Sequence, residues 1–205
     1  MSGDLFPEGA ALVVGGSGGI GQAVCRELAR AGTDVALTYH GRQSAAERLG
    51  EEIRALGRKA TVHQLTIGDP DQVDAVVADA AREHRRLHTI VVGAGTLPKQ
   101  VLLSQMSREQ WRTVVDQDLN GFFNVVQATL PRLKEWGGGS YVHIGSSGHL
   151  RWPDRDGLSV IPKAAIEPQP PVEIAAADKV EIVAEEIEVE VVDVADPIVE
   201  ETPEL

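Results

Sequence analysis

The sequence has very little cysteine: Cys25 is the only one in 205 residues. A single thiol excludes an internal disulfide and any zinc site built from several cysteines. No uncharged apolar run approaches the ~18 residues of a membrane-spanning helix, and residues 1–11 carry acids and a proline where a signal peptide has a basic patch. We therefore expect a chain without a membrane span or a bound metal, in the reducing cytoplasm.

Basic residues are nearly absent from the end of the chain, which accounts for the net charge of −12. Residues 1–165 hold 18 basic and 18 acidic side chains, whereas residues 166–205 hold one basic residue, Lys179, and 13 acidic ones. That segment also lacks glycine, arginine and aromatic residues, but it has five of the 11 prolines. The acidity disfavours nucleic-acid binding, and the change in composition predicts a globular domain over 1–167 and an acidic tail over 168–205.

Strand-like and helix-like segments alternate through the first part. Short apolar runs, typical of buried parallel strands, lie at residues 11–14, 35–39, 61–65, 89–92 and 141–144. Helical spacing appears between them, first along Ile20, Ala23, Val24 and Leu28. We predict an α/β fold with a doubly wound, Rossmann-like parallel sheet that is incomplete at its C-terminal end and is followed by the acidic tail.

Helix starts are marked by capping signals. Residues 44–47 (Ser to Glu) and 107–110 (Ser to Gln) have the capping-box spacing, in which each side chain bonds the other residue's backbone. Asp69 before Pro70 fits an N-cap followed by proline in the first helical position. A long helix is expected from about Asp116 to Trp136.

A glycine-rich turn follows the first predicted strand directly. Such a turn lets the backbone approach a pyrophosphate, whose negative charge meets the free N–H groups at the next helix start. Its place between the first strand and the first helix predicts dinucleotide binding rather than a plain flexible turn. The residues expected to contact the cofactor here are Gly15, Ser17, Gly18, Gly19, Ile20 and Gly21.

Five motifs, in order, resemble the short-chain dehydrogenase/reductase family over about residues 8–167. The first, Gly15-x-x-x-Gly19-x-Gly21, is similar to the family's cofactor loop. The others are Val92-Gly93-Ala94-Gly95, Asp118-Leu119-Asn120-Gly121, Ile144-Gly145-Ser146-Ser147 and Ser159-x-x-x-Lys163-Ala164-Ala165. They lie where the family has Asn-Asn-Ala-Gly, Asn-Leu-x-Gly, the strand with its catalytic Ser, and Tyr-x-x-x-Lys-Ala-Ala.

The resemblance implies hydride transfer between a nicotinamide cofactor and a small carbonyl or alcohol substrate. It implies that Ser146 orients the substrate oxygen and that Lys163 serves in catalysis and binds the nicotinamide ribose. Two further catalytic positions hold Ser159 in place of the family's Tyr and Asp118 in place of its water-holding Asn. The resemblance adds backbone contacts to the cofactor at Gly93, Ala94 and Gly95. A homo-oligomer stays open, since the family uses the Tyr-x-x-x-Lys helix as a dimer surface.

Departures from the family pattern bear on the chemistry. An alkyl hydroxyl titrates far above tyrosine's ~10, so Ser159 is a poor general acid. Asp118 is either a substitute for the family's Asn or an acid favoured at a helix N-terminus. Lys163 either binds the ribose or is a plain surface lysine. Thr66 lies where the family has an adenine-binding Asp. His149 is either a substitute proton donor or a solvated loop residue.

The end of the second strand bears on the choice of cofactor. An acid there would bond the ribose 2′-OH of NAD, but residues 38–42 contain none. Arg42 and Ser17 are placed instead to contact a 2′-phosphate, although Arg42 could also be a plain loop charge. This favours NADP and leaves NAD open.

The sequence of the tail does not decide whether it is ordered or what it does. Prolines 168, 170 and 171 are expected to end the preceding helix, and residues 186–191 alternate acidic and apolar side chains. That alternation fits an edge strand or an extended, solvated acidic segment. Three functions follow: a short-chain oxidoreductase, a nucleotide-binding module whose chemistry has lapsed, or an interaction role through the tail.

Overall fold

The computed structural model describes residues 5–96, 99–151 and 153–166. At His149 it describes the backbone but not the side chain. The predicted boundary at residue 167 and the tail therefore lie outside the described residues, as does the side chain considered for a proton donor at His149. Within the described part, no helix combines the length and the apolar character needed to cross a membrane.

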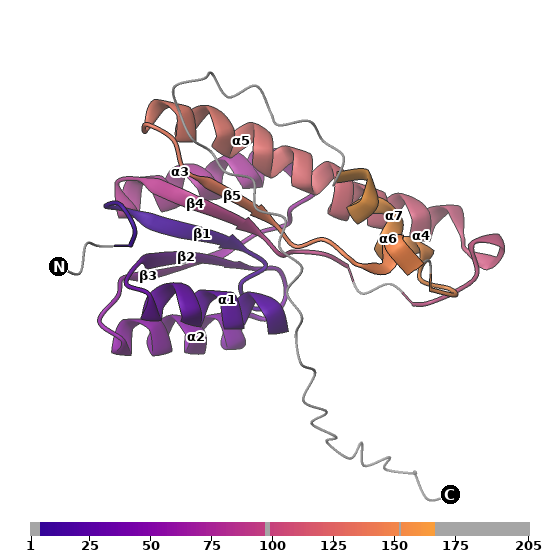
Figure 1. The fold of residues 1–205 in the computed structure, drawn as a ribbon, viewed down its shortest axis with the longest axis horizontal. Coiled ribbons are helices and arrows are strands. Elements are labelled where there is room, and N and C mark those ends of the chain that lie inside the picture. Colours follow the sequence, from indigo (N-terminus) through magenta and orange to yellow (C-terminus); the bar gives the residue numbers. More distant parts are fainter. Residues whose placement is uncertain (1–4, 97–98, 152, 167–205) are drawn as a thin grey trace, which may run out of the picture.

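One parallel sheet forms the centre of the molecule, with the strand order β3-β2-β1-β4-β5 (Figure 1). Its strands are β1 (Ala10–Val14), β2 (Asp34–Tyr39), β3 (Ala60–Gln64), β4 (Leu87–Val92) and β5 (Ser140–His143). All five match the predicted runs to within two residues. From β1 the chain builds β2 and β3 on one side of β1, and it then returns to place β4 on the other side of β1. The strand order therefore reverses between β1 and β4, and their carboxyl ends flank the point where such sheets bind ligands.

Helices cover both faces of the sheet, which confirms the doubly wound fold (Figure 1). One face carries α1 (Gly19–Arg30) and α2 (Gln43–Ala55), and the other carries α3 (Pro70–His84) and α5 (Gly121–Glu135). Alternate strand residues supply the two cores, because side chains in a strand point to opposite faces. Beyond the carboxyl ends lie the short elements η1 (Leu103–Gln105), α4 (Arg108–Val114), η2 (Val115–Asn120), α6 (Gly148–Arg151) and α7 (Gly157–Ile166).

Two of the three predicted helix starts are confirmed. The Asp69 carboxylate accepts the N–H of Gln72 at 3.2 Å, and residues 107–110 form the reciprocal capping box. The capping box at Ser44 is wrong, because α2 begins one residue earlier, at Gln43. Ser44 therefore lies inside the first turn, and the N-cap position is taken by Arg42, whose side chain makes no capping bond.

The helix α1 does not bury the apolar stripe that the sequence suggests. Its buried residues are Gly21, Cys25 and Ala29, whose small side chains let the helix lie close to the sheet. Ile20 is 48% exposed, and Val24 is only half-buried. Val24 and Leu28 therefore pack only on the margin of the core, and Ile20 lies largely outside it.

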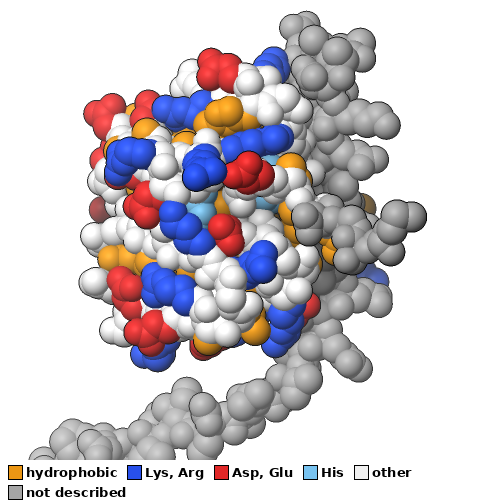
Figure 2. Space-filling view, turned by 90° about the vertical axis from the view of Figure 1, so that its left-hand side faces the viewer, with side chains coloured by type: hydrophobic (Ala, Val, Ile, Leu, Met, Phe, Trp, Pro, Cys, Tyr) orange, Lys and Arg blue, Asp and Glu red, His pale blue; other side chains and the backbone are white. Residues whose placement is uncertain are grey.

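Two fully buried histidines, His84 and His88, lie toward the amino end of the strands, opposite the ligand-binding end. His88 Nε2 lies 2.9 Å from the Thr33 hydroxyl, and the ring nitrogens of His84 and His63 both bond the Thr61 hydroxyl. Figure 2 shows histidine side chains on this side of the molecule among basic and acidic groups. Burial lowers the pKa of all three, that of His88 to about 4, so the network is held neutral.

We expect the free energy of unfolding to fall as the pH drops below about 6.5, where an unfolded histidine takes up a proton. Because the folded chain keeps His88 neutral down to about pH 4, the unfolded state binds protons first. Its contribution is complete above about pH 6.5 and is lost as the pH falls through the folded pKa, by up to about 3 kcal/mol. Urea unfolding at several pH values measures this decline.

In the variant His88→Gln the free energy of unfolding should decline less steeply as the pH falls. The variant His40→Gln, at an exposed position, should keep the native dependence of the free energy of unfolding on pH. An identical slope in the native chain and in His88→Gln would contradict the assignment.

Candidate functional site

The loop after β1 is a tight glycine turn that touches the loop after β4. Gly15 has a φ of +86°, and a Cβ on it would lie 2.7 Å from the backbone nitrogen of Ala94. The Gly15 N–H donates to the Thr38 hydroxyl at 3.0 Å, and the Gly18 N–H donates to the Gly15 carbonyl at 3.0 Å. A Cβ on Gly21 would lie 2.2 Å from the Gly15 oxygen. Glycine is therefore required for the ends of β1, β2 and β4 to meet.

The start of α1 presents open backbone N–H groups. Its N-cap, Gly18, supplies no side-chain bond, so the N–H groups of Gly19, Ile20 and Gly21 have no partner within the helix. A Cβ on Gly19 would meet no atom within 4 Å, so the space beside it is open. Ser17 is buried in the same turn, against the end of β2. This helix end is suited to hold an anion.

Gly95, Asp118 and Lys163 come together at the carboxyl end of β4. A Cβ on Gly95 would lie 3.6 Å from Asp118 Oδ2 and 4.0 Å from Lys163 Cε. Asp118 is 6% exposed; its Oδ1 accepts the Thr96 N–H at 2.9 Å and its Oδ2 accepts the Thr96 hydroxyl at 3.4 Å. Burial raises the pKa of Asp118, and the Thr96 bonds and the Lys163 charge oppose that shift. The carboxylate thus holds the β4 loop beside a cation.

A π-helical turn, η2, places Asp118 in this position. The helix runs on from α4 through η2 into α5, so the predicted helix start near Asp116 is wrong. The interpretation of Asp118 as an acid at a helix N-terminus is also wrong, because helical residues precede it. Such wide turns occur often at functional sites.

Ser159 and Lys163 lie one turn apart in α7. Pro162 lies inside this helix without ending it, and the Val160 N–H donates to the Asp156 carbonyl at 3.0 Å where the helix begins. Residues four apart share a helix face, so the two predicted catalytic side chains lie on one side of α7. Both are half-buried.

Ser146 follows β5 and is packed against the start of α6. Its Oγ accepts the Gly148 N–H at 3.2 Å. A Cβ on Gly148 would lie 2.5 Å from Val160 Cγ2, so this glycine lets α6 pack directly on α7. The contact brings the segment that carries Ser146 to the helix that carries Ser159 and Lys163.

Sequence reasoning missed Thr96 and His143. The His143 ring packs edge-to-face on Phe122, with the centroids 4.9 Å apart. Burial and, to a smaller extent, the charge of Lys163 lower its pKa to about 4, and the Val92 carbonyl opposes both. Neither ring nitrogen has a hydrogen bond of normal geometry within the described part. A neutral imidazole therefore lies near Lys163, and only the three-dimensional packing shows it.

Arg42 and Thr66 lie at the far side of this end of the sheet. Arg42 is exposed in the loop after β2, which contains no acid. Thr66 follows β3, and its N–H donates to Gln72 Oε1 at 3.1 Å. The loop after β2 therefore presents an exposed cation and no acid.

The family model of "short chain dehydrogenase" matches residues 9–153. The chain is 33% identical over 137 residues to a "3-oxoacyl-[acyl-carrier-protein] reductase FabG" of Staphylococcus aureus (strain MW2), which covers 67% of this chain and 55% of that protein. It is 40% identical over 124 residues to "Short-chain dehydrogenase/reductase FrzI" of Cladobotryum sp, covering 60% and 48% respectively. The chain thus spans about half the length of these curated relatives.

Solved structures agree with the fold. A short chain dehydrogenase from Burkholderia cenocepacia J2315, solved in complex with NADP, superimposes with a TM-score of 0.72 at 32% identity, over 78% of this chain and 64% of that one. An NAD+-bound xylitol dehydrogenase gives a TM-score of 0.75 at 23% identity, over 79% and 62%, and this likeness supports the fold alone.

Proposed function

Because this chain belongs to the short-chain dehydrogenase family, we propose that it is a nicotinamide-dependent oxidoreductase that interconverts a carbonyl and an alcohol. One observation carries the proposal: the glycine turn meets the β4 loop, and Gly95 on that loop lies beside Asp118 and Lys163. An anion site and a charged pair therefore share the carboxyl end of the sheet, where this fold binds ligands.

The residues at this end fit a dinucleotide cofactor. The open N–H groups at Gly19, Ile20 and Gly21 would hold the pyrophosphate. The backbone of Gly93, Ala94 and Gly95 would lie along the cofactor, and Lys163 would bond the nicotinamide ribose. When bound, the cofactor supplies the hydride.

Ser146 and Lys163 act on the substrate oxygen in this proposal. Addition of hydride to a carbonyl carbon moves an electron pair onto oxygen, which must then take a proton. The Ser146 hydroxyl donates a hydrogen bond to that oxygen, and the Lys163 ammonium stabilises its negative charge. Asp118 positions the β4 loop beside Lys163 through Thr96. Because Ser159 is short and weakly acidic, protonation of the oxygen limits the rate.

The test is calorimetric titration of the chain with NADPH and NADH, followed by cofactor oxidation with a panel of ketones. A 3-oxoacyl thioester belongs in the panel because the S. aureus relative is named for such a substrate. Slow, cofactor-dependent reduction of at least one ketone is expected. Binding without any turnover would show a nucleotide-binding module, and no binding would overturn the proposal.

We propose that NADP is the preferred cofactor, through a bond from Arg42 to the 2′-phosphate. A hydrogen bond to a charged group contributes ~1.5–3 kcal/mol, so Arg42→Ala should weaken NADPH binding roughly 10- to 100-fold. NADH binding should be unchanged, because NADH lacks that phosphate. Arg42 makes no capping bond, so its loss leaves α2 intact.

The matched control for this measurement is Arg48→Ala, which removes an exposed cation from α2, the helix that Arg42 precedes. Equal loss of NADPH affinity in both variants would indicate a general effect of charge, and no loss in Arg42→Ala would remove Arg42 from the site.

A further inference from the structure

The strand β5 and the helix α7 pass each other in opposite directions. Just beyond the carboxyl end of β5, a Cβ on Gly148 would lie 2.5 Å from Val160 Cγ2, early in α7. At the other end Ile166, the last residue of α7, is buried in the same core cluster as Tyr141 of β5. His143 on β5 and Lys163 on α7 lie between these two places, so the chain brings them to the same level.

The two side chains share the faces that these elements turn toward the core. Tyr141 and His143 are two residues apart in β5, so they lie on one face, and both rings pack edge-to-face on Phe122, at 6.0 and 4.9 Å between centroids. Lys163 and the buried Ile166 are three residues apart and share a helix face. The effect of the Lys163 charge on the His143 ring agrees with this proximity.

Both groups have unused hydrogen-bonding capacity. The two His143 ring nitrogens are buried, and neither has a hydrogen bond of normal geometry within the described part of the chain. A neutral ring has one N–H donor and one acceptor nitrogen. The Val92 carbonyl, which acts on this ring, can take the N–H, and the other nitrogen then remains as an acceptor. The half-buried Lys163 ammonium carries three N–H donors.

We propose that His143 is a positioning residue for Lys163, and that in the cofactor-bound chain its acceptor nitrogen takes one N–H of the ammonium. The inference rests on the proposed binding of the nicotinamide ribose by Lys163. A bound cofactor removes water from this end of the sheet, where an unpaired N–H or ring nitrogen costs free energy, and one bond between them satisfies both. Asp118, on η2, attracts the same ammonium, so the two residues direct its remaining N–H toward the ribose.

The ring is suited to this task because it is neutral. Burial and the Lys163 charge lower the pKa of His143 to about 4, so the ring is uncharged at neutral pH. A protonated ring would have no acceptor nitrogen and would repel the ammonium. The contact with Phe122 fixes the plane of the ring, which holds the acceptor in one place.

The test measures NADPH affinity by calorimetry in three variants. His143→Phe keeps a ring on Phe122 but removes the acceptor, so the affinity should fall about 10-fold. His143→Gln offers a carbonyl oxygen as acceptor and should stay within about 3-fold of the native affinity. Tyr141→Phe removes a polar group from the same strand face and should leave the affinity unchanged. Urea unfolding checks that each variant is folded.

The same comparison in a Lys163→Met background shows whether His143 acts through the lysine. There His143→Phe should change the affinity by less than about 2-fold, because residues in contact have non-additive effects. An equal loss in both backgrounds, or an equal loss in His143→Phe and His143→Gln, would overturn the proposal and leave cofactor binding standing. Absence of NADPH binding by the native chain would instead overturn the proposed function, and this inference with it.

Nitrogen NMR of the native chain gives a second measurement. When NADPH is added, the acceptor nitrogen of the His143 ring should shift upfield, as it does on gaining a hydrogen bond, and the ring should stay neutral at pH 7. The signal is identified by its loss in His143→Gln, and Lys163→Met should abolish the shift. An unchanged acceptor nitrogen at saturating NADPH would contradict the proposed bond.

Discussion

Replacing Ser159 by Tyr is expected to raise the rate of carbonyl reduction roughly 10²- to 10⁴-fold, the usual contribution of a positioned general acid. The helix α7 runs through Pro162, so residues 159 and 163 share a face. A Tyr at 159 would extend its hydroxyl along the side that carries the Lys163 ammonium. The cation favours the phenolate and lowers the tyrosine pKa toward the working range. NADPH oxidation between pH 6 and 9 measures the gain.

Two matched variants separate proton transfer from packing. Ser159→Phe adds the ring without the hydroxyl, so it should give no gain. Lys163→Met in the Ser159→Tyr background should lose most of the gain and shift the pH profile upward, because the cation that lowers the pKa is gone. Equal rates in the native and Ser159→Tyr chains, with cofactor affinity intact, would show that another group donates the proton.

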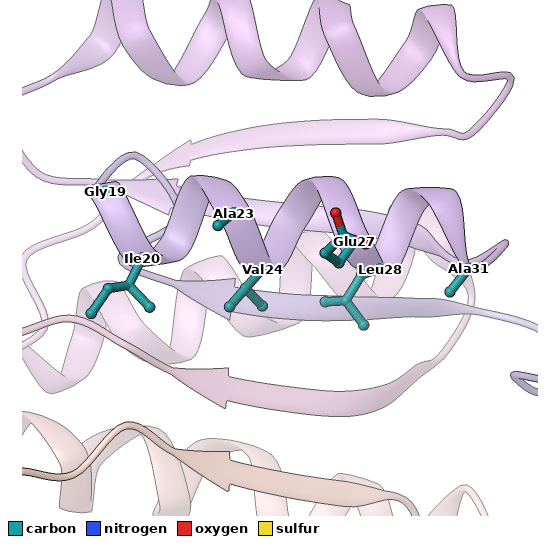
Figure 3. Close-up of a pocket in the computed structure, with 7 residues that line it drawn as sticks. All are labelled: Gly19, Ile20, Ala23, Val24, Glu27, Leu28 and Ala31. Atoms are coloured by element: carbon teal, nitrogen blue, oxygen red, sulfur yellow. The ribbon is translucent and has the colours of Figure 1, made fainter. Parts of the chain in front are cut away.

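Replacing Gly19 by Val is expected to weaken cofactor binding at least ~100-fold while the fold persists. A Cβ at this position, at the start of α1 (Figure 3), would meet no atom of the neighbouring segments within 4 Å, so we expect the loop to tolerate the substitution. It fills the space in front of the free N–H groups, where two charge-assisted bonds of ~1.5–3 kcal/mol each would form. Calorimetry with NADPH measures the affinity, and urea unfolding measures the stability.

The comparison with Gly21→Val distinguishes a direct block of cofactor binding from a general loss of folding stability. A Cβ there would lie 2.2 Å from the Gly15 oxygen, so that variant should lose stability as well as affinity. Ala55→Val introduces the same residue at an exposed site on α2 and should change neither. Unchanged affinity in Gly19→Val would remove the glycine turn from the site.

The features that could be predicted from the sequence were those fixed by short-range patterns. Five apolar runs located the five strands, and the glycine spacing located the turn, because only glycine fits φ +86° at Gly15 and the close approach at Gly21. The catalytic positions at Ser146, Ser159 and Lys163 came from the family resemblance, and the structure places them around α6 and α7. Their roles remain proposals.

The features that could not be predicted depend on packing between distant segments. The bonds from Thr96 to Asp118 join residues far apart in sequence, and the π-turn that permits them has no spacing signal. The side of α1 that enters the core was also ambiguous. The stripe at Ile20 and Val24 is the more apolar, but the smaller residues at Gly21 and Cys25 allow the closer approach to the sheet.

The position of His88 in the fold has a consequence for engineering. The network around His88 and the cluster around Lys163 lie at opposite ends of the strands. A strand of five to six residues separates its ends by about 16–20 Å, well beyond the ~10 Å within which substitutions usually interact. Substitutions at His88 that reduce the loss of stability in acid should therefore combine additively with substitutions near Lys163 that change turnover, and the two properties can be selected in separate libraries.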